Sequence, residues 1–264
     1  MNTRALAYNL EVPTPFYHIS LAYELLEHSE VDPNIKDLLN NHSSGFMFGN
    51  TAPDVQVISG ATREDTHFFT IPPEGRVPAW QHMLAAHPGF VNDGQLTPDK
   101  AAFIAGYICH LQADEKWIIE LFLPIFGPDA GWADFRQRLY LHNVLRAYMD
   151  QQVIATMPAE AGAQLQASHP NNWLPFVEDR HLLEWQSYLA VQLRPGEDVK
   201  TAEVFAERLG LQIEEFTNML NSEFRMDKEI FIHLPRERTA EFRSTLVAEN
   251  VQLINNYLET IQGI

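Results

Sequence analysis

The chain has 264 residues, of which 45% are hydrophobic and 20% are charged. This length and composition are ample for a buried core and exclude a chain that is disordered throughout. Lys and Arg number 18 against 35 Asp and Glu, so the formal net charge is −17. This charge disfavours nucleic acids and anionic membrane surfaces as partners, because like charges repel at long range. The single cysteine, Cys109, excludes an internal disulfide.

Membrane and export signals are absent from the sequence pattern. No segment approaches the roughly 20 consecutive apolar residues that a membrane-spanning helix needs. Residues 1–12 lack the apolar stretch of a signal peptide. We therefore expect a cytoplasmic protein without a transmembrane segment, and the sequence leaves its oligomeric state open.

Apolar residues recur at helical spacing along most of the chain, and no segment shows β-alternation. The pattern predicts an all-α fold. Thr14 and Pro15 form a helix start signal, because proline is tolerated in the first turn of a helix. Helices are expected over residues 15–30, 34–42, 98–122, 134–157, 178–193, 201–209, 213–220 and 239–261.

Three stretches between these helices are expected to be largely non-helical. Residues 43–63 contain several glycines and prolines and are predicted to be irregular. Residues 64–98 are predicted to form a long loop around a short helix near 78–86, and residues 162–175 a polar connection. The turn at residues 194–198 divides the chain into a helical domain, 1–195, and a C-terminal helical extension, 196–264.

The strongest chemical signal is His110 followed four residues later by Asp114. On a helix this spacing places both side chains on one face. The surrounding helix is apolar on most faces, so that face is expected to be buried. A buried His and a buried Asp must be paired with each other or bound to something. Taken alone, the two are best explained as a hydrogen-bonded structural pair.

Three more polar residues lie in apolar surroundings: His18, Asp54 and His67. Singly, each fits a structural role, such as a packed histidine or an Asx turn. Together with His110 and Asp114 they form a set of five nitrogen and oxygen donors of the kind that zinc and similar metals prefer. The next candidate ligands are His142 and Asp150 on the helix over 134–157, and Glu120 is a further one.

Other reaction types find little support. The sequence has no His-Asp dipeptide, no H-E-x-x-H, no G-x-S-x-G, no G-x-G-x-x-G and no Walker motif. Cys109 lies in the middle of an apolar helix with no cation beside it, so it is expected in the core rather than as a nucleophile.

The order of these residues resembles a known family. His18 is followed by Ala-Pro-Asp at 52–54, Thr-His-Phe at 66–68, Gly-Tyr at 106–107, and then His110 and Asp114. This pattern, over roughly residues 14–120, is similar to the bacterial zinc-dependent phospholipase C family. That family shares its all-helical fold with the single-strand-specific zinc nucleases.

The resemblance implies a cluster of up to three zinc ions in a cleft between helices. Its first site would take Asp54, His67, His110 and Asp114, with Asp114 bridging towards a second metal. His18 corresponds to the histidine of the site that shares this Asp. His142 corresponds to a later histidine of the remaining site.

The sequence departs from the family in four places. Well-studied members use the amino group of an N-terminal tryptophan as a ligand, whereas here a segment precedes His18. Family members have a Glu four residues after the late His, which corresponds to His142. This chain has Arg146 there, and Asp150 or Glu120 is the candidate ligand in place of that Glu. A further family histidine has no counterpart between His110 and His142. In choline-specific members an aromatic residue follows the first-site Asp, whereas Val55 follows Asp54 in this chain. These departures favour one or two ions over three, and they weaken the expectation of phosphocholine specificity.

The pattern therefore predicts a metal-dependent phosphoester hydrolase, with zinc or another divalent metal as cofactor and a metal-activated water as nucleophile. Asp54 is the candidate residue that orients or deprotonates the water. The expected substrate is a small-molecule or lipid phosphoester. The alternative is a non-catalytic metal-binding or interaction module on the same scaffold.

Overall fold

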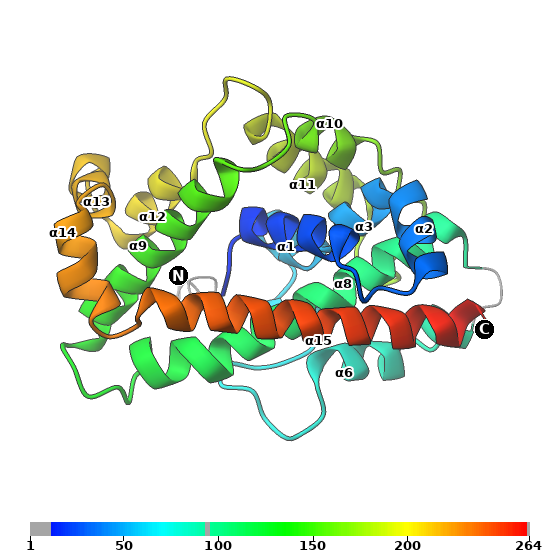
Figure 1. Ribbon diagram of the computed structural model, residues 1–264, viewed down its shortest axis with the longest axis horizontal. Helices are drawn as coiled ribbons and strands as arrows, with labels where there is room; N and C mark the ends of the chain where they lie inside the picture. The colour runs from blue at the N-terminus through cyan, green and yellow to red at the C-terminus, as the bar shows by residue number, and fades with distance from the viewer. Residues whose placement is uncertain (1–11, 93–95, 263–264) are drawn as a thin grey trace.

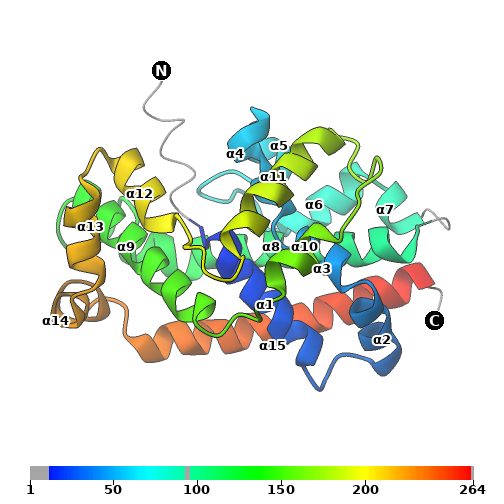
Figure 2. The ribbon, with the colours of Figure 1, turned by 90° about the horizontal axis from the view of Figure 1, so that it is seen from above.

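The computed structural model describes residues 12–92 and 96–262, and these residues form an all-α fold without β-strands, as predicted (Figure 1). Residues 1–11, where no signal peptide is expected, lie outside the described residues. Helix α15 runs along the length of the molecule, beside α1 and α8. Helices α12, α13 and α14 gather at one end and α2 and α7 at the other (Figure 2). None of the described helices combines the length and the apolar character needed to cross a membrane.

The helices have the following bounds: α1 Pro15–Glu27, α2 Pro33–Asn41, α3 Ser43–Gly49, η2 Ala52–Val55, α4 Gln56–Ser59, α5 Arg63–His67, α6 Ala79–Ala86, α7 Gly89–Asn92, α8 Pro98–Trp117, η3 Ile118–Phe126, α9 Phe135–Ile154, α10 Ala161–Gln166, α11 Asp179–Gln192, α12 Thr201–Leu209, α13 Ile213–Leu220, α14 Glu223–Met226, η4 Asp227–Phe231 and α15 Arg236–Gln262. Of these, η2 is a 3₁₀-helix, whereas η3 and η4 are π-helices.

Helix α8 is the central element of the fold. It begins at Thr97, whose hydroxyl accepts a hydrogen bond from the Lys100 backbone N–H, with Pro98 in the first turn. Most of its side chains are buried, and it packs against α3, α6 and α15. It continues into the π-helix η3 without a break, so the predicted helix over 98–122 extends to Phe126. Its all-round burial explains why His110 and Asp114 need partners inside the protein.

The prediction that residues 43–63 are irregular is wrong, because helices α3, η2 and α4 lie in this stretch. Gly60 ends α4 with a positive φ of 78°, but Gly45 and Gly49 allow close packing. A β-carbon on Gly49 would lie 2.0 Å from the Phe103 carbonyl oxygen, and one on Gly45 would lie 2.7 Å from that of Asp99. On the facing helix, a β-carbon on Gly106 would lie 2.2 Å from the Phe46 carbonyl oxygen. The three glycines let α3 approach the backbone of α8 directly.

Two further stretches contain more helix than the sequence pattern predicted. The predicted loop 64–98 contains α6, which was expected, but also the end of α5 and the short helix α7. The predicted connection 162–175 begins inside helix α10, where Gly162 again allows close approach: a β-carbon there would lie 2.7 Å from the Ala190 carbonyl oxygen. Helix α14 and the π-helix η4 were missed because they are short and precede α15, which itself begins three residues earlier than expected.

The C-terminal region contacts several parts of the fold. Helices α12 and α13 pack on α9, and α15 lies against α8, α1 and α2. The buried residues of α15, such as Leu246 and Ile254, belong to the same core cluster as those of α1 and α8. The division into 1–195 and 196–264 stays a prediction.

We expect Gly49→Ala to lower the free energy of unfolding by roughly 2–4 kcal/mol, because overpacking at a backbone contact forces the helices apart. Urea unfolding followed by circular dichroism measures this change. Gly89→Ala is the matched control, because a β-carbon there meets nothing within 4 Å. Equal stability of the two variants would contradict the close packing of α3 on α8.

Candidate metal centre

Four helices bring the five predicted donors together. His18 comes from α1, Asp54 from η2, His67 from α5, and the last two, His110 and Asp114, from α8. Each helix has a local reason to begin where it does. Thr14 caps α1, Pro53 opens η2, and Thr62 and Asp65 form a capping box at the start of α5. Helices with fixed starting points hold these side chains in a defined orientation.

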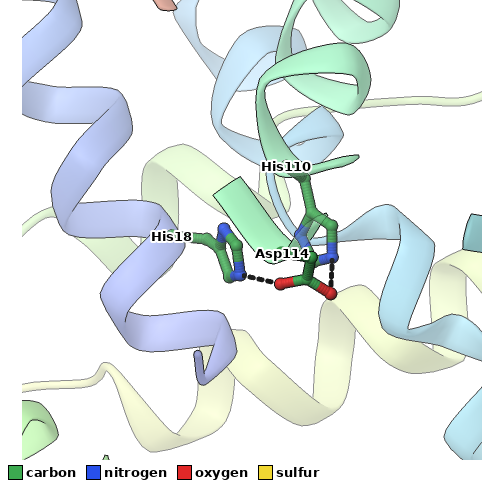
Figure 3. Close-up of side chains that lie close together, drawn as sticks. All are labelled: His18, His110 and Asp114. Atoms are coloured by element: carbon green, nitrogen blue, oxygen red, sulfur yellow. Dashed lines mark hydrogen bonds and ion pairs between the residues drawn. The ribbon is translucent and has the colours of Figure 1, made fainter. Parts of the chain in front are cut away.

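The Asp114 carboxylate lies at the centre of the group (Figure 3). Its Oδ1 lies 3.1 Å from His18 Nε2, and its Oδ2 lies 3.4 Å from His110 Nε2 and 3.3 Å from His67 Nε2. The His18 and His110 rings stack with their centroids 3.9 Å apart. All four side chains are 0% exposed. Three imidazole nitrogens therefore converge on one buried carboxylate.

Asp54 joins the group through His67. Its Oδ1 lies 3.6 Å from His67 Nε2, and His67 Nε2 lies 3.3 Å from His110 Nε2. One set of donor atoms within 4.8 Å of one another comes from His18, His110 and Asp114, and a second comes from Asp54, His67 and His110. The two sets share His110, so they form one continuous cluster rather than two separate sites.

Contacts behind two of the rings hold them in place. His110 Nδ1 donates to the Asn50 carbonyl oxygen at 2.8 Å, because a carbonyl only accepts. Thr66 Oγ1 lies 2.9 Å from His67 Nδ1, and the Tyr107 hydroxyl donates to the Thr66 carbonyl oxygen at 2.6 Å. With Nδ1 held by Asn50, His110 presents Nε2 to the cluster. Such outer contacts are typical of metal-binding histidines.

The electrostatics of the cluster favour bound cations. Burial lowers the pKa of His18 to about 4 and also lowers that of His67, so both rings are neutral near pH 7. Burial opposes ionisation of Asp114 and Asp54, but the charge of His110 outweighs it and lowers the pKa of both carboxyls. Burial also lowers the pKa of His110, but Asp114 and Asp54 outweigh it and raise that pKa overall. Neutral imidazole and ionised carboxylate are the forms that bind metals.

A comparison with protein families supports the interpretation of this cluster as a metal site. Residues 14–115 match the family model described as zinc-dependent phospholipase C. This segment carries the signature of that family. A search of curated proteins and a search of solved structures each found no match. The matched segment contains all five clustered residues, and it ends one residue after Asp114.

Arg63 is a member of the cluster that the sequence analysis missed. Its Nη2 donates to Asp114 Oδ2 at 2.8 Å, and its guanidinium lies 4.9 Å from the centre of the Phe69 ring. The side chain is buried, and its Nε and Nη1 have no hydrogen-bond partner among the described residues. The one sequence signal was its position four residues before His67 in a capped helix, which places both on one face.

The structure does not bring His142 to the five clustered residues, although the sequence analysis proposed it as a ligand. Its Nε2 accepts a hydrogen bond from Trp117 Nε1 at 3.0 Å. The rings of Phe122 and Phe126 lie 4.9 and 5.1 Å from its own centroid. A lone pair that accepts from an indole is engaged, so this ring is held as part of the aromatic core.

Asp150 also lies outside both donor sets. Its two carboxylate oxygens accept hydrogen bonds from the hydroxyls of Thr14 and Thr201. Burial raises the pKa of Asp150 to about 7, against the opposing effect of those hydroxyls and of Arg146. Glu120, the other substitute ligand, accepts a hydrogen bond from Lys116 at 3.0 Å. The third group of ligands expected from the resemblance is thus dispersed.

The raised pKa of Asp150 predicts a pH-dependent effect on stability. A carboxyl that titrates near 7 in the folded chain and near 4 in the unfolded chain lowers the free energy of unfolding as the pH rises between these values. We expect Asp150→Asn to be more stable than the wild type at pH 8 and to lose most of this advantage at pH 5. Each pKa unit is worth about 1.4 kcal/mol, and urea unfolding at both pH values measures the difference.

The exposed Asp198, changed to Asn, is the matched control. A stability difference between Asp150→Asn and the wild type that does not vary with pH would show that Asp150 is ionised throughout.

Proposed function

We propose that the protein is a metal-dependent phosphoester hydrolase similar to the zinc-dependent phospholipases C. The observation that carries this proposal is the convergence of three imidazole Nε2 atoms and two carboxylates at the centre of the fold. The match of residues 14–115 to the family supports it. A buried set of this kind has little structural purpose without a cation, because apolar residues would fill the same space at lower cost.

The residues fit a zinc site. Arg63 and His110 balance the two carboxylates, which raise the pKa of His110, whereas His18 and His67 are neutral. A divalent ion would displace the proton of His110 and take its place beside the carboxylates. His18, Asp54, His67, His110 and Asp114 would hold the metal. Bound zinc would supply a Lewis acid for the phosphoryl oxygens and would lower the pKa of a coordinated water.

Asp54 is the residue that we propose to act directly in the reaction. It is the member of the cluster that also lines a surface cleft, and it is 6% exposed. Its lowered pKa keeps the carboxylate ionised, so it can accept a proton or orient the water that attacks phosphorus. Asp114, which is fully buried and surrounded by cationic and imidazole groups, instead holds the cluster together.

The remaining residues of the cluster position the others. Thr66 and Asn50 hold the rings of His67 and His110 from behind. Arg63 neutralises part of the charge of Asp114. We propose a small-molecule or lipid phosphoester as the substrate, in agreement with the family description.

A second candidate function is a metal-binding or interaction module without turnover. The ion pair between Arg63 and Asp114 favours it, because a permanent cation already engages the carboxylate oxygen that faces His67 and His110. Metal binding without hydrolysis would select this alternative.

We expect the purified protein to contain zinc or a similar ion and to hydrolyse bis-p-nitrophenyl phosphate. Asp114→Asn should lose the metal and lower the rate on the order of 100-fold or more, because even outer partners of metal ligands cost about 10–100-fold. Elemental analysis and absorbance at the nitrophenolate band measure the two effects.

The exposed His82, changed to Gln, is the matched control and should keep both metal and rate. Hydrolysis that resists a chelator, or full metal occupancy in Asp114→Asn, would contradict the proposal.

A separate variant tests the number of ligands. We expect His142→Gln to keep the metal content of the wild type, because His142 accepts from Trp117 and lies outside both donor sets. The thermal midpoint should fall, since the ring packs between aromatic side chains. A loss of one ion per chain in a folded variant would place His142 in a metal site.

A further inference from the structure

A cleft beside the metal centre is lined, apart from Asp54, by residues that belong to neither donor set. Asp54 lies at its edge, and the cleft encloses a cavity of about 90 Å³. Its cationic side chains are Arg146 from α9, Lys200 in the turn before α12, and Arg208 from α12. Most of its lining comes from residues after position 115, outside the segment that matches the family.

The charge of this cleft is opposite to that of the chain. Three cations and one carboxylate, Asp54, line it in the described part of the chain, whereas the whole chain carries a formal charge of −17. A small positive region on an acidic protein concentrates anions locally and steers them to that point. The arrangement therefore selects a ligand with negative charge.

Arg146 is the most informative of these residues. It is 4% exposed, and its Nη1 donates to Asn143 Oδ1 at 3.0 Å. Its Nε has no hydrogen-bond partner, and no ion pair joins it to a carboxylate in the described residues. Burial, and then the charge of Arg208, lower the pKa of Arg146 to about 10. A buried guanidinium with an unpaired donor beside a second arginine calls for an anion.

The other walls of the cleft are apolar. The Phe205 ring lies 4.5 Å from the Arg146 guanidinium, and Trp185 and Leu189 are buried beside it. Val57 and Tyr188 are 40% and 42% exposed at the rim. Such walls accommodate a short hydrocarbon group attached to the anion.

We propose that this cleft binds the phosphate of an organic phosphate with a small apolar group, and that Arg146 and Arg208 hold its oxygens. The proposal rests on the proposed function, because Asp54 belongs to both the cleft and the metal centre, so a ligand in the cleft would lie next to the metal site. It specifies an anionic ligand. A quaternary ammonium group is disfavoured, because the two arginines that line the cleft repel it.

Hexyl phosphate is the probe that tests this proposal by isothermal titration calorimetry. Hexyltrimethylammonium has the same chain with the opposite charge. Each is titrated into the protein as purified and after treatment with a chelator and desalting. We expect hexyl phosphate to bind in both states, hexyltrimethylammonium to bind in neither, and Arg208→Gln to weaken hexyl phosphate binding about tenfold or more.

Arg194→Gln is the matched control, because Arg194 is exposed and does not line the cleft. Arg146→Met tests the contribution of the buried arginine, and its thermal midpoint shows whether the variant folds. If Arg146→Met does not fold, Arg208→Gln still tests the proposal. Equal affinity for the two probes, or equal binding by Arg208→Gln and Arg194→Gln, would overturn the proposal.

Vesicles of phosphatidylcholine with and without phosphatidic acid distinguish a lipid headgroup from a soluble phosphate. A lipid ligand is supported if the protein sediments with the phosphatidic acid vesicles and Arg208→Gln abolishes this sedimentation. A soluble phosphate is supported if the protein binds hexyl phosphate but not the vesicles. Hydrolysis of bis-p-nitrophenyl phosphate is measured in parallel. If the chelated protein binds hexyl phosphate but the purified protein hydrolyses nothing, this inference stands and the proposed function fails. If the protein hydrolyses bis-p-nitrophenyl phosphate but does not bind hexyl phosphate, the proposed function stands and this inference fails.

Discussion

The burial of the Asp114 carboxylate is the constraint on which the rest of this structure depends. An ionised carboxylate with no exposure to water is costly unless cations and hydrogen-bond donors surround it. Here His18, His67, His110 and Arg63 all lie within 3.4 Å of its two oxygens. These partners come from α1, α5 and α8, so the need to satisfy one side chain fixes the relative positions of three helices.

Close helix packing makes that arrangement possible. Gly49 and Gly106 let α3 and α8 meet backbone to backbone, and Asn50, at the end of α3, then receives the Nδ1–H of His110. A side chain of ordinary size at either glycine would separate the helices and move this carbonyl. The orientation of a candidate metal ligand is therefore coupled to the absence of two β-carbons elsewhere in the fold.

Two buried arginines near the metal centre, Arg63 and Arg146, have different surroundings. Arg63 is paired with Asp114 inside the matched family segment, and it lowers the negative charge of the cluster. Arg146 lies beyond that segment and lines the neighbouring cleft, and its Nε has no hydrogen-bond partner among the described residues. A buried cation at this position attracts an anion, not a metal ion, to the adjacent space.

The sequence by itself determined the helical class, the positions of the long helices and the five clustered donors. Those features depend on local spacing: the apolar period, the caps at Thr14 and Thr97, and the four-residue step from His110 to Asp114. Each is expressed within one helix, so a single sequence is sufficient to find it.

Tertiary structure decided the rest, because the remaining features depend on contacts between distant segments. Gly45 and Gly49 have the character of turn residues until α8 lies against them. His142 and Asp150 have side chains that can bind metals, but His142 accepts a hydrogen bond from Trp117, and Asp150 accepts hydrogen bonds from two threonines. Arg63 gave almost no local signal, and Arg146 and Arg208 meet only when α12 packs on α9. Spacing along a chain cannot show which side of a helix faces which partner, and that choice separates a ligand from a core residue.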